Sequence, residues 1–465
     1  MSRSGTALVT SLVMFLAGCN KGPPPAAVVT TPDASGPGVD ASTGFTIQAL
    51  GCGGAGTQSA IAVSGTKVAV VSLAQTSMTQ TCTIMPLGPV MMSQVQIWDV
   101  CFAQSNAGGM YTSKVLTSQP YTDPTGVSVA FDSKGNAAVA YTGVGSTPAA
   151  ERCGANDLFV IDSQAGTFGM PVQVSNGSTT GGLVAAQAGN CTQNVCGSGD
   201  TTGLWPAIGF DPFDTPMVAY RDVHFGFAMD DYAKSDVEFA EGNGSGYSTL
   251  TVDVSRGGGT YNRLAFTPAG LPSVLQYDAT GTVPGVYVDT ELMAGSVATQ
   301  LAVGGWGATQ VSIGPITDQL GFGINAQGLF AAAYYDMGMS RLLYTESKDG
   351  ITWVAATSID TNGSTGFYPS LAFDSSGEPG IAYYRCNSHA GTGMKCDPSQ
   401  DGLYLARRTG TTWNVQVVAD DPNVTDGLYP ALAFVKDKAV IAYQNTSFDP
   451  VAMAASATWW VAEEQ

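Results

Sequence analysis

One short pattern recurs along this chain and restricts its fold more than any other feature of the sequence. The clearest copy is YPSLAFDSSGEPGIAYYR (368–385), in which two stretches of alternating apolar residues flank a turn rich in Asp, Ser and Gly. Alternation with a period of two predicts strands, and a tight polar turn between two strands predicts a β-hairpin. Further copies occupy residues 127–143, 206–222, 262–278, 320–336 and 430–445, with a weaker copy at 59–72.

A second, less regular hairpin follows the first, as in GLYLARRTGTTWNVQVV (402–418) and SRLLYTESKDGITWVAAT (340–357). Four antiparallel strands per unit, with units about 50 to 80 residues apart, predict the blades of a β-propeller. Frequent Gly (58 residues) and Pro (24 residues) fit an all-β chain with many turns. We expect an all-β fold, a β-propeller with seven four-stranded blades. Six blades would result if the weak first copy is not a complete unit, and a pair of β-sandwiches fits the even repeats less well.

The two ends of the repeat region predict how the ring closes. The last unit contains its first hairpin and one further apolar stretch, AMAASATWWVAEE (452–464), so that it lacks a fourth strand. A lone strand, FTIQAL (45–50), precedes the first unit and resembles NVQVVA (414–419). We therefore expect this N-terminal strand to complete the last blade, which also covers edges that an open sheet would expose.

Two residue types recur in the first strand of the units. A small residue lies near its middle and suits the crowded centre of a ring, and the aromatic residue beside it suits packing between blades. The small residues are Ala130, Gly209, Ala265, Gly323, Ala372 and Ala433, and the aromatic residues are Phe131, Phe210, Phe266, Phe373 and Phe434.

The N-terminus predicts the cellular compartment. A basic start, a short apolar stretch (7–15) and Leu-Ala-Gly before Cys19 form an export signal that is too short to span a membrane. These residues resemble the bacterial lipobox, in which the signal is cleaved before the cysteine and the thiol carries the lipid. Asn20 then favours the outer membrane of the cell envelope, facing the periplasm or the cell surface. We expect a lipoprotein signal peptide (1–18), lipidated Cys19 with a flexible Pro/Ala/Gly linker (19–44), and the propeller domain (45–465).

The remaining cysteines predict disulfides. Nine cysteines less Cys19 leave eight, an even number, which in an exported chain indicates up to four disulfides. Cys191–Cys196 and Cys386–Cys396 are close enough in sequence to pair locally. Cys52, Cys82, Cys101 and Cys153 would pair among themselves, with the connectivity left open. No pair has Cys-x-x-Cys spacing, so a zinc site is not expected.

Loop lengths predict which face of the ring carries a site. The turns inside hairpins are short, whereas 222–236, 385–401 and a stretch between 74 and 92 are long loops on the opposite face. The stretch 176–204, which contains Cys191 and Cys196, is a long loop on that face too. Long loops on one face of a repeat scaffold are where binding sites usually evolve.

Three sets of residues fall on this face. Aromatic residues before the first strands suit stacking on sugars or peptide side chains, or wedging between blades. Polar residues at the ends of the second strands would form a mostly acidic rim, and both histidines of the chain lie in long loops. The aromatic set is Trp205, Tyr261, Tyr368 and Tyr429; the polar set is Asp222, Asp278, Asp336, Arg385 and Asn445; the histidines are His224 and His389; and Asp222, Asp230 and Asp231 are candidate calcium ligands.

The segment SKDGITW (347–353) is similar to the Asp-box of sialidase-like propellers, with one residue missing between Asp349 and Gly350. The resemblance implies the same architecture over residues 45–465 and a box that stabilises a turn without taking part in catalysis. Sialidases also use three arginines to bind a carboxylate, and Arg221, Arg263 and Arg385 are the arginines expected near the mouth of the ring. The Arg-Ile-Pro motif of these enzymes is absent.

These features favour a lipid-anchored envelope or cell-surface propeller that binds a ligand or a protein partner through its long-loop face. A sialidase-like glycan hydrolase or lyase at this face is one alternative, and a structural module of an envelope complex is another. We lean against an enzyme and expect a monomer, with glycans, peptides or envelope proteins as partners. A net charge of −19 disfavours nucleic acid, and no cofactor is evident, although calcium remains a candidate.

Overall fold

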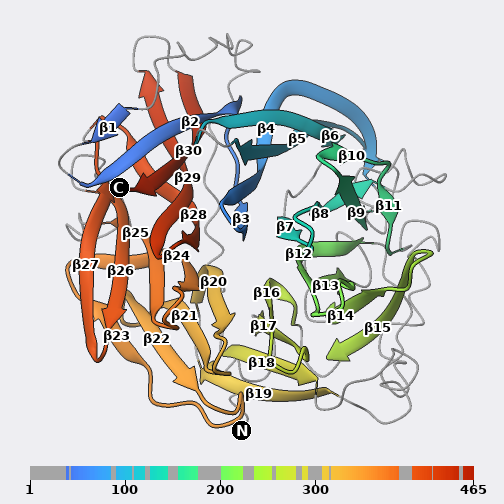
Figure 1. The fold of residues 1–465 in the computed structure, drawn as a ribbon. Coiled ribbons are helices and arrows are strands. Elements are labelled where there is room, and N and C mark those ends of the chain that lie inside the picture. Colours follow the sequence, from blue (N-terminus) through green and yellow to red (C-terminus); the bar gives the residue numbers. More distant parts are fainter. Residues whose placement is uncertain are drawn as a thin grey trace, which may run out of the picture. The chain divides into compact units, whose positions relative to one another are not determined.

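The computed structural model forms a ring of β-sheets around a central axis (Figure 1). Within the residues it describes there are thirty strands and no α-helix. These residues belong to one compact unit, Ser35–Gln465. The described residues are 38–40, 43–84, 91–106, 109–120, 126–144, 156–175, 201–223, 235–253, 258–278, 285–291, 306–313, 316–386, 401–421, 423–449 and 454–465.

The first three blades follow one another around the ring (Figure 1). In each blade the first strand lies innermost, and the strands pair antiparallel in chain order. The first blade is β3 (Ser59–Ser64), β4 (Lys67–Ile84), β5 (Met91–Ser105) and β6 (Tyr111–Pro120). The second is β7 (Val127–Phe131), β8 (Ala137–Val144), β9 (Asn156–Gln164) and β11 (Val172–Gln173), with β10 (Thr167–Phe168) also on β9. The third is β12 (Thr201–Phe210), β13 (Pro216–Val223), β14 (Ser235–Gly242) and β15 (Tyr247–Asp253).

The next three blades repeat this order. The fourth is β16 (Thr260–Phe266), β17 (Pro272–Asp278), β18 (Gly285–Glu291) and β19 (Trp306–Ile313). The fifth is β20 (Ile316–Ile324), β21 (Phe330–Asp336), β22 (Arg341–Ser347) and β23 (Thr357–Asp360). The sixth is β24 (Ser364–Phe373), β25 (Pro379–Cys386), β26 (Gly402–Thr409) and β27 (Thr412–Ala419). The weak first copy is therefore a full blade, and the prediction of seven blades rather than six is confirmed.

The seventh blade takes its fourth strand from the other end of the chain. β28 (Thr425–Val435), β29 (Lys438–Asp449) and β30 (Ala454–Glu464) pair in order, and β2 (Phe45–Gly53) lies antiparallel to β30, with Phe45 opposite Glu464. β1 (Gly38–Asp40) adds to the outer edge of β2. The predicted closure by the N-terminal strand is confirmed.

Side chains at the first hairpin turns explain why these turns stay short. A side-chain oxygen at the end of the inner strand accepts a hydrogen bond from the backbone N–H that opens the second strand, as from Asn136 to Asp132 (2.7 Å) and from Glu378 to Asp374 (3.0 Å). Such local bonds fix a tight turn. Asp211, Thr267 and Asn325 do the same in the third, fourth and fifth blades. We call this side of the ring the short-turn face and the opposite side the long-loop face.

Adjacent inner strands fit by pairing a small residue with an aromatic ring. A Cβ atom added to Gly209 would lie 2.5 Å from the ring of Phe266 in the next blade, and one added to Gly323 would lie 3.3 Å from Phe373. Atoms cannot approach to 2.5 Å without displacement, so a larger residue at 209 would push the two blades apart. At these two boundaries the phenylalanine packs between blades, as the sequence predicted, and the glycine, which was expected to suit the crowded centre of the ring, makes room for it.

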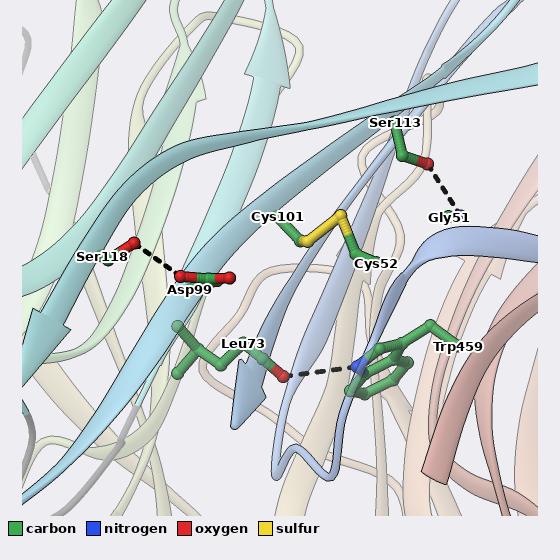
Figure 2. The surroundings of a disulfide bond; sticks show 8 residues. All are labelled: Gly51, Cys52, Leu73, Asp99, Cys101, Ser113, Ser118 and Trp459. Atoms are coloured by element: carbon green, nitrogen blue, oxygen red, sulfur yellow. Dashed lines mark hydrogen bonds between the residues drawn. A yellow bond between two sulfur atoms is a disulfide. The ribbon is translucent and has the colours of Figure 1, made fainter. Parts of the chain in front are cut away.

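The junction between the last and first blades is sealed by several contacts (Figure 2). The indole N–H of fully buried Trp459, on β30, donates to the carbonyl of Leu73, on β4, at 3.3 Å. A disulfide joins Cys52 on β2 to Cys101 on β5, which selects one pairing among those the sequence left open. Cys386 is also disulfide-bonded, while Cys153, Cys191, Cys196 and Cys396 lie outside the described residues.

One predicted loop is an arm of two strands. The stretch between 74 and 92 was expected to be a loop on the long-loop face, but β4 continues to Ile84 and β5 begins at Met91, and the two remain paired up to these residues. Alternate threonines in this segment favour extended backbone, because β-branched side chains fit a pleated sheet. The strand signal was present in the sequence, but the polar composition of the segment hid it.

We predict that the bond across this junction stabilises the ring. Trp459→Phe should lower the free energy of unfolding by about 2 kcal/mol, because it leaves a buried carbonyl without its donor and removes packed volume. Its neighbour Trp460 is the matched control: its indole nitrogen is buried with no partner in the described part of the chain. Trp460→Phe should therefore change stability by less than about 1 kcal/mol. Urea unfolding of both variants checks this, and equal losses would contradict it.

Candidate functional site

The inner strands enter the ring through a recurring bulge on the long-loop face. Register shifts between the first two strands fall after Leu204, Thr260, Phe367 and Leu428. In each case the first residue left out of the ladder is an aromatic residue predicted from the sequence. The four are Trp205, Tyr261, Tyr368 and Tyr429.

The backbone at these four residues is left-handed. Their φ angles are 46° at Trp205, 58° at Tyr261, 55° at Tyr368 and 51° at Tyr429, and Gln319 at the same position of the fifth blade has 61°. This conformation costs a bulky residue about 1–2 kcal/mol, so the surrounding structure imposes it. The first two blades place Gln58 and Gly126 at the corresponding positions. We call these seven residues the mouth ring: Gln58, Gly126, Trp205, Tyr261, Gln319, Tyr368 and Tyr429.

A glycine two residues earlier explains why the bulge recurs. Gly203 and Gly366 also have positive φ, and an added Cβ would lie 2.6 Å from the backbone of Leu158 or 2.4 Å from Leu342 in the preceding blade. Gly259 and Gly427 repeat the arrangement. Only glycine combines this backbone with so close an approach. The spacing Gly-x-aromatic was visible in the sequence and would have identified the bulge.

Mouth-ring residues touch across blade boundaries. The rings of Trp205 and Tyr261 are 5.6 Å apart and perpendicular in the manner of an edge contact, and those of Tyr368 and Tyr429 are 4.4 Å apart. All four aromatic residues are half-buried. Tyr261 and Tyr429 also pack on the cores between blades, so wedging and exposure occur together. An added Cβ on Gly126 would lie 2.9 Å from Gln58 and 3.0 Å from the Trp205 backbone, so the ring is continuous from the first blade to the third.

A buried arginine supports the Trp205 side of the ring. Arg221 is only 2% exposed, and its guanidinium lies 5.4 Å from the centre of the Trp205 ring. It donates to the hydroxyls of Thr260 at 2.7 Å and Ser235 at 2.6 Å. This cation–π contact and the two bonds hold the guanidinium inside the boundary between the third and fourth blades.

The polar residues at the ends of the second strands do not form the expected acidic rim. Asp222 and Asp278 are 1% and 0% exposed, so they lie inside the blades rather than in solvent. Asn445 donates to Asp426 at 2.7 Å, and half-buried Asp336 accepts from the backbone of Met339 at 2.7 Å. The sequence could not show this burial, because it depends on lateral packing of neighbouring blades.

Arg385 is held by an ion pair between the fifth and sixth blades. Its guanidinium bonds Asp360, whose carboxylate also accepts from Tyr383 at 2.7 Å, and it lies 3.6 Å from the ring centre of Tyr404. Arg221 and Arg385 therefore serve two different blade boundaries. Arg263 is a third case, because burial lowers its pKa to about 10 and its guanidinium bonds the adjacent backbone carbonyl of Asn262. These partners of the three arginines lie at different places: Thr260 and Ser235 for Arg221, Asn262 for Arg263, and Asp360 for Arg385.

No metal centre emerges from the residues that the structure describes, since no group of three or more His, Cys, Asp or Glu side chains among them is arranged to hold an ion. His224, His389, Asp230 and Asp231 lie outside the described residues. Asp222 instead faces Asp236 and Glu238 across the sheet, and burial together with the Asp222 charge raises the pKa of Glu238 well above its usual value. Burial and the neighbouring Asp222 charge therefore both disfavour the charged form of Glu238.

The Asp-box stabilises a turn. Asp349 accepts from the backbone N–H groups of Ile351 (2.9 Å) and Thr352 (2.7 Å), and these bonds hold its pKa down to about 2. Ser347 accepts from Gly350, and the indole of Trp353 donates to the Gly350 carbonyl. Every bond stays within the turn, which fits a structural device rather than a reactive group.

No protein-family model and no curated protein sequence matches this chain. Similar solved structures include the polysaccharide lyase Uly1, with 11% identity and a TM-score of 0.48 over 88% of this chain and 90% of the other. The Hadza microbial sialidase Hz136 has 12% identity and a TM-score of 0.45 over 80% and 75% of the two chains. A protein of unknown function from Dyadobacter fermentans has 9% identity and a TM-score of 0.44 over 90% and 98%. The resemblance to sialidase-like propellers is one of architecture only.

We predict a pH dependence centred on Asp426, which lies beside the mouth ring. Burial raises its pKa from 3.8 to about 6, against the opposing effect of bonds from Asp421 and Asn445. A carboxyl group whose pKa is higher in the folded state binds more protons when folded, so stability from this group rises as pH falls from about 7 to about 4. Asp426→Asn should flatten that rise by about 2–3 kcal/mol. Urea unfolding at several pH values checks this, and parallel curves for variant and parent would refute it.

Proposed function

We propose that this protein is a lipid-anchored propeller of the bacterial envelope that binds a neutral glycan at the mouth ring. The observation that carries the proposal is the set of four half-buried aromatic residues held by one repeated bulge on the long-loop face. Aromatic rings stack on the apolar faces of sugar rings, and the amide of half-buried Gln58 supplies a donor and an acceptor for hydroxyls.

Charge favours a neutral glycan over an acidic one. The chain carries a net charge of −19, which repels carboxylated sugars at long range. Recognition of a sugar carboxylate would need a free guanidinium. Arg385 is paired with Asp360, and Arg221 is buried against Ser235 and Thr260. Arg263 makes one bond, to the carbonyl of Asn262, and is the least engaged of the three arginines. The preference for a neutral ligand therefore rests on the net charge and on the engagement of Arg221 and Arg385.

Two alternatives use the same face. In one, the protein is a glycan hydrolase or lyase, with catalytic groups that include residues outside the described part of the chain. In the other, it is a structural module of an envelope complex and takes no glycan. Asp222, Asp230 and Asp231 remain candidate ligands of a calcium ion. Glycan binding is therefore measured both with and without calcium.

We predict that Tyr368→Gly weakens glycan binding about tenfold or more. Loss of one stacked ring removes about 1–2 kcal/mol, while glycine accepts the left-handed backbone without strain. Tyr368→Phe keeps the ring and should bind within about threefold of the parent chain. The measurement is calorimetric titration of the full chain in detergent with neutral hexasaccharides of glucose, mannose, xylose and N-acetylglucosamine.

The same samples distinguish the alternatives. Shortened products after prolonged incubation would indicate a hydrolase, and unsaturated products would indicate a lyase. Either result would favour the enzyme alternative over a binding protein. Failure of the folded parent chain to bind any glycan would contradict the proposal and favour the structural module. Equal affinity of Tyr368→Gly and the parent chain would place binding elsewhere on the molecule.

We predict that Cys19→Ala abolishes membrane attachment. The reason is that the proposed lipid anchor is attached to the Cys19 thiol, which alanine lacks. In the described residues there is no helix long and apolar enough to cross a membrane. Fractionation of cells that express parent and variant chains tests the anchor. Variant protein that remains in the membrane fraction after a salt wash would overturn it.

A further inference from the structure

A cavity of about 320 Å³ lies between the outer strands of the fifth and sixth blades. Residues of β22, β23, β26 and β27 line it, together with the segment that follows the Asp-box and the turn between β26 and β27, so it opens toward the short-turn face. It therefore lies away from the mouth ring, which is on the other face. Its size is at the lower end of the range for small-molecule sites, about 300–1,000 Å³.

Two aromatic side chains form one wall of this cavity, which we call the rim cavity. Tyr344 and Trp413 meet edge to face, with ring centres 5.0 Å apart. Tyr344 is buried, whereas Trp413 is half-buried and its neighbour Thr411 is exposed. Among the described residues, no hydrogen bond from the indole N–H of Trp413 is found. A half-buried indole at the wall of a pocket can still offer part of its ring to a sugar that carries hydroxyls on its edge.

Charged groups on the opposite side are fixed by one another. Arg408 donates to Glu346 at 2.6 Å and to Glu378 at 2.8 Å, and its guanidinium lies 5.7 Å from the centre of the Tyr344 ring. Tyr344 donates to the same Glu346 oxygen at 2.8 Å. Burial acts to raise the pKa of Glu346, but the bonds from Arg408 and Tyr344 together outweigh it and lower the pKa, which favours the charged carboxylate at neutral pH.

This arrangement leaves polar atoms available to a ligand. Among the described residues, the side-chain bonds to Glu346 use its Oε2 atom, which leaves Oε1 as an acceptor. The bonds from Arg408 to other described residues use Nε and Nη1, which leaves Nη2 as a donor. Because the acceptor and the donor are already held in place beside an aromatic ring, little conformational entropy is lost when a ligand binds. Two neighbouring hydroxyls of a sugar can bond to both.

We propose that the rim cavity is a second carbohydrate site, which binds a neutral pyranose by stacking on Trp413 and by hydroxyl bonds to Glu346 and Arg408. One guanidinium faces two carboxylates there, so the site carries a net negative charge and repels acidic sugars. The argument uses none of the mouth-ring residues and does not depend on the proposed function.

The test separates the two sites by working in the Tyr368→Gly background. The full chain in detergent is titrated with the neutral hexasaccharides named above and with sialyllactose and oligogalacturonate as acidic probes. Residual binding of a neutral probe should fall about tenfold or more in Tyr368→Gly/Trp413→Ala, in line with loss of one stacked ring. Exposed Asn414, beside Trp413 and outside the cavity lining, provides the control variant Asn414→Ala, which should bind as before.

Two further variants keep the test decisive if Trp413→Ala does not fold. Trp413→Phe keeps the stacking face and loses the indole donor, and Glu346→Gln removes the carboxylate charge. Both should weaken neutral-sugar binding about threefold to tenfold, consistent with loss of one hydrogen bond. Three results would overturn the rim site. These are unchanged affinity in both variants, tighter binding of the acidic probes than of the neutral ones, and no residual binding in the Tyr368→Gly background. Loss of binding with Trp413→Ala but not with Tyr368→Gly would instead uphold it and refute the mouth ring.

Discussion

The pairing of β2 with β30 is the constraint on which the rest of the structure depends. Without β2, the seventh blade would have only three strands and β30 would be its unpaired outer strand. Unpaired strand edges are open to association with other chains. Here the N-terminal strand completes the last sheet, Trp459 bonds the first blade across the junction, and a disulfide fixes β2 to β5. Closure holds each inner strand between two neighbours, and only then can the glycine and aromatic contacts between blades form.

The same lateral packing accounts for the mouth ring. Glycines such as Gly203 and Gly366 allow the preceding blade to approach at a distance that no other residue permits, and the aromatic residue two positions later adopts a left-handed backbone. The strain recurs because the geometry of one blade boundary recurs. What differs from blade to blade is the side chain at this position: aromatic in four blades, glutamine in two and glycine in one. Function on this face would reside in those differences.

Much of the fold followed from the sequence because hairpin periodicity is local information. The seven units, the short Asp- or Asn-closed turns and the missing fourth strand of the last blade are all visible in the order of residues. The four aromatic positions were also found this way. The rim of carboxylates was not, since Asp222 and Asp278 have the same sequence signature whether they face solvent or a neighbouring blade. The arm of β4 and β5 was missed because its strands pair mainly with each other and bury little surface.

The sequence by itself determined that this chain forms repeated hairpins and that its two ends complement one another, and it favoured seven units over six. Only the tertiary structure decided which polar side chains are buried, which cysteine pairs with Cys52, and that Tyr344 from one blade meets Trp413 from the next to line a cavity. The physical reason is the range of the interactions. Strand alternation and turn chemistry act over a few neighbouring residues, whereas burial and contacts between blades depend on residues about sixty positions apart that meet only after the ring has closed.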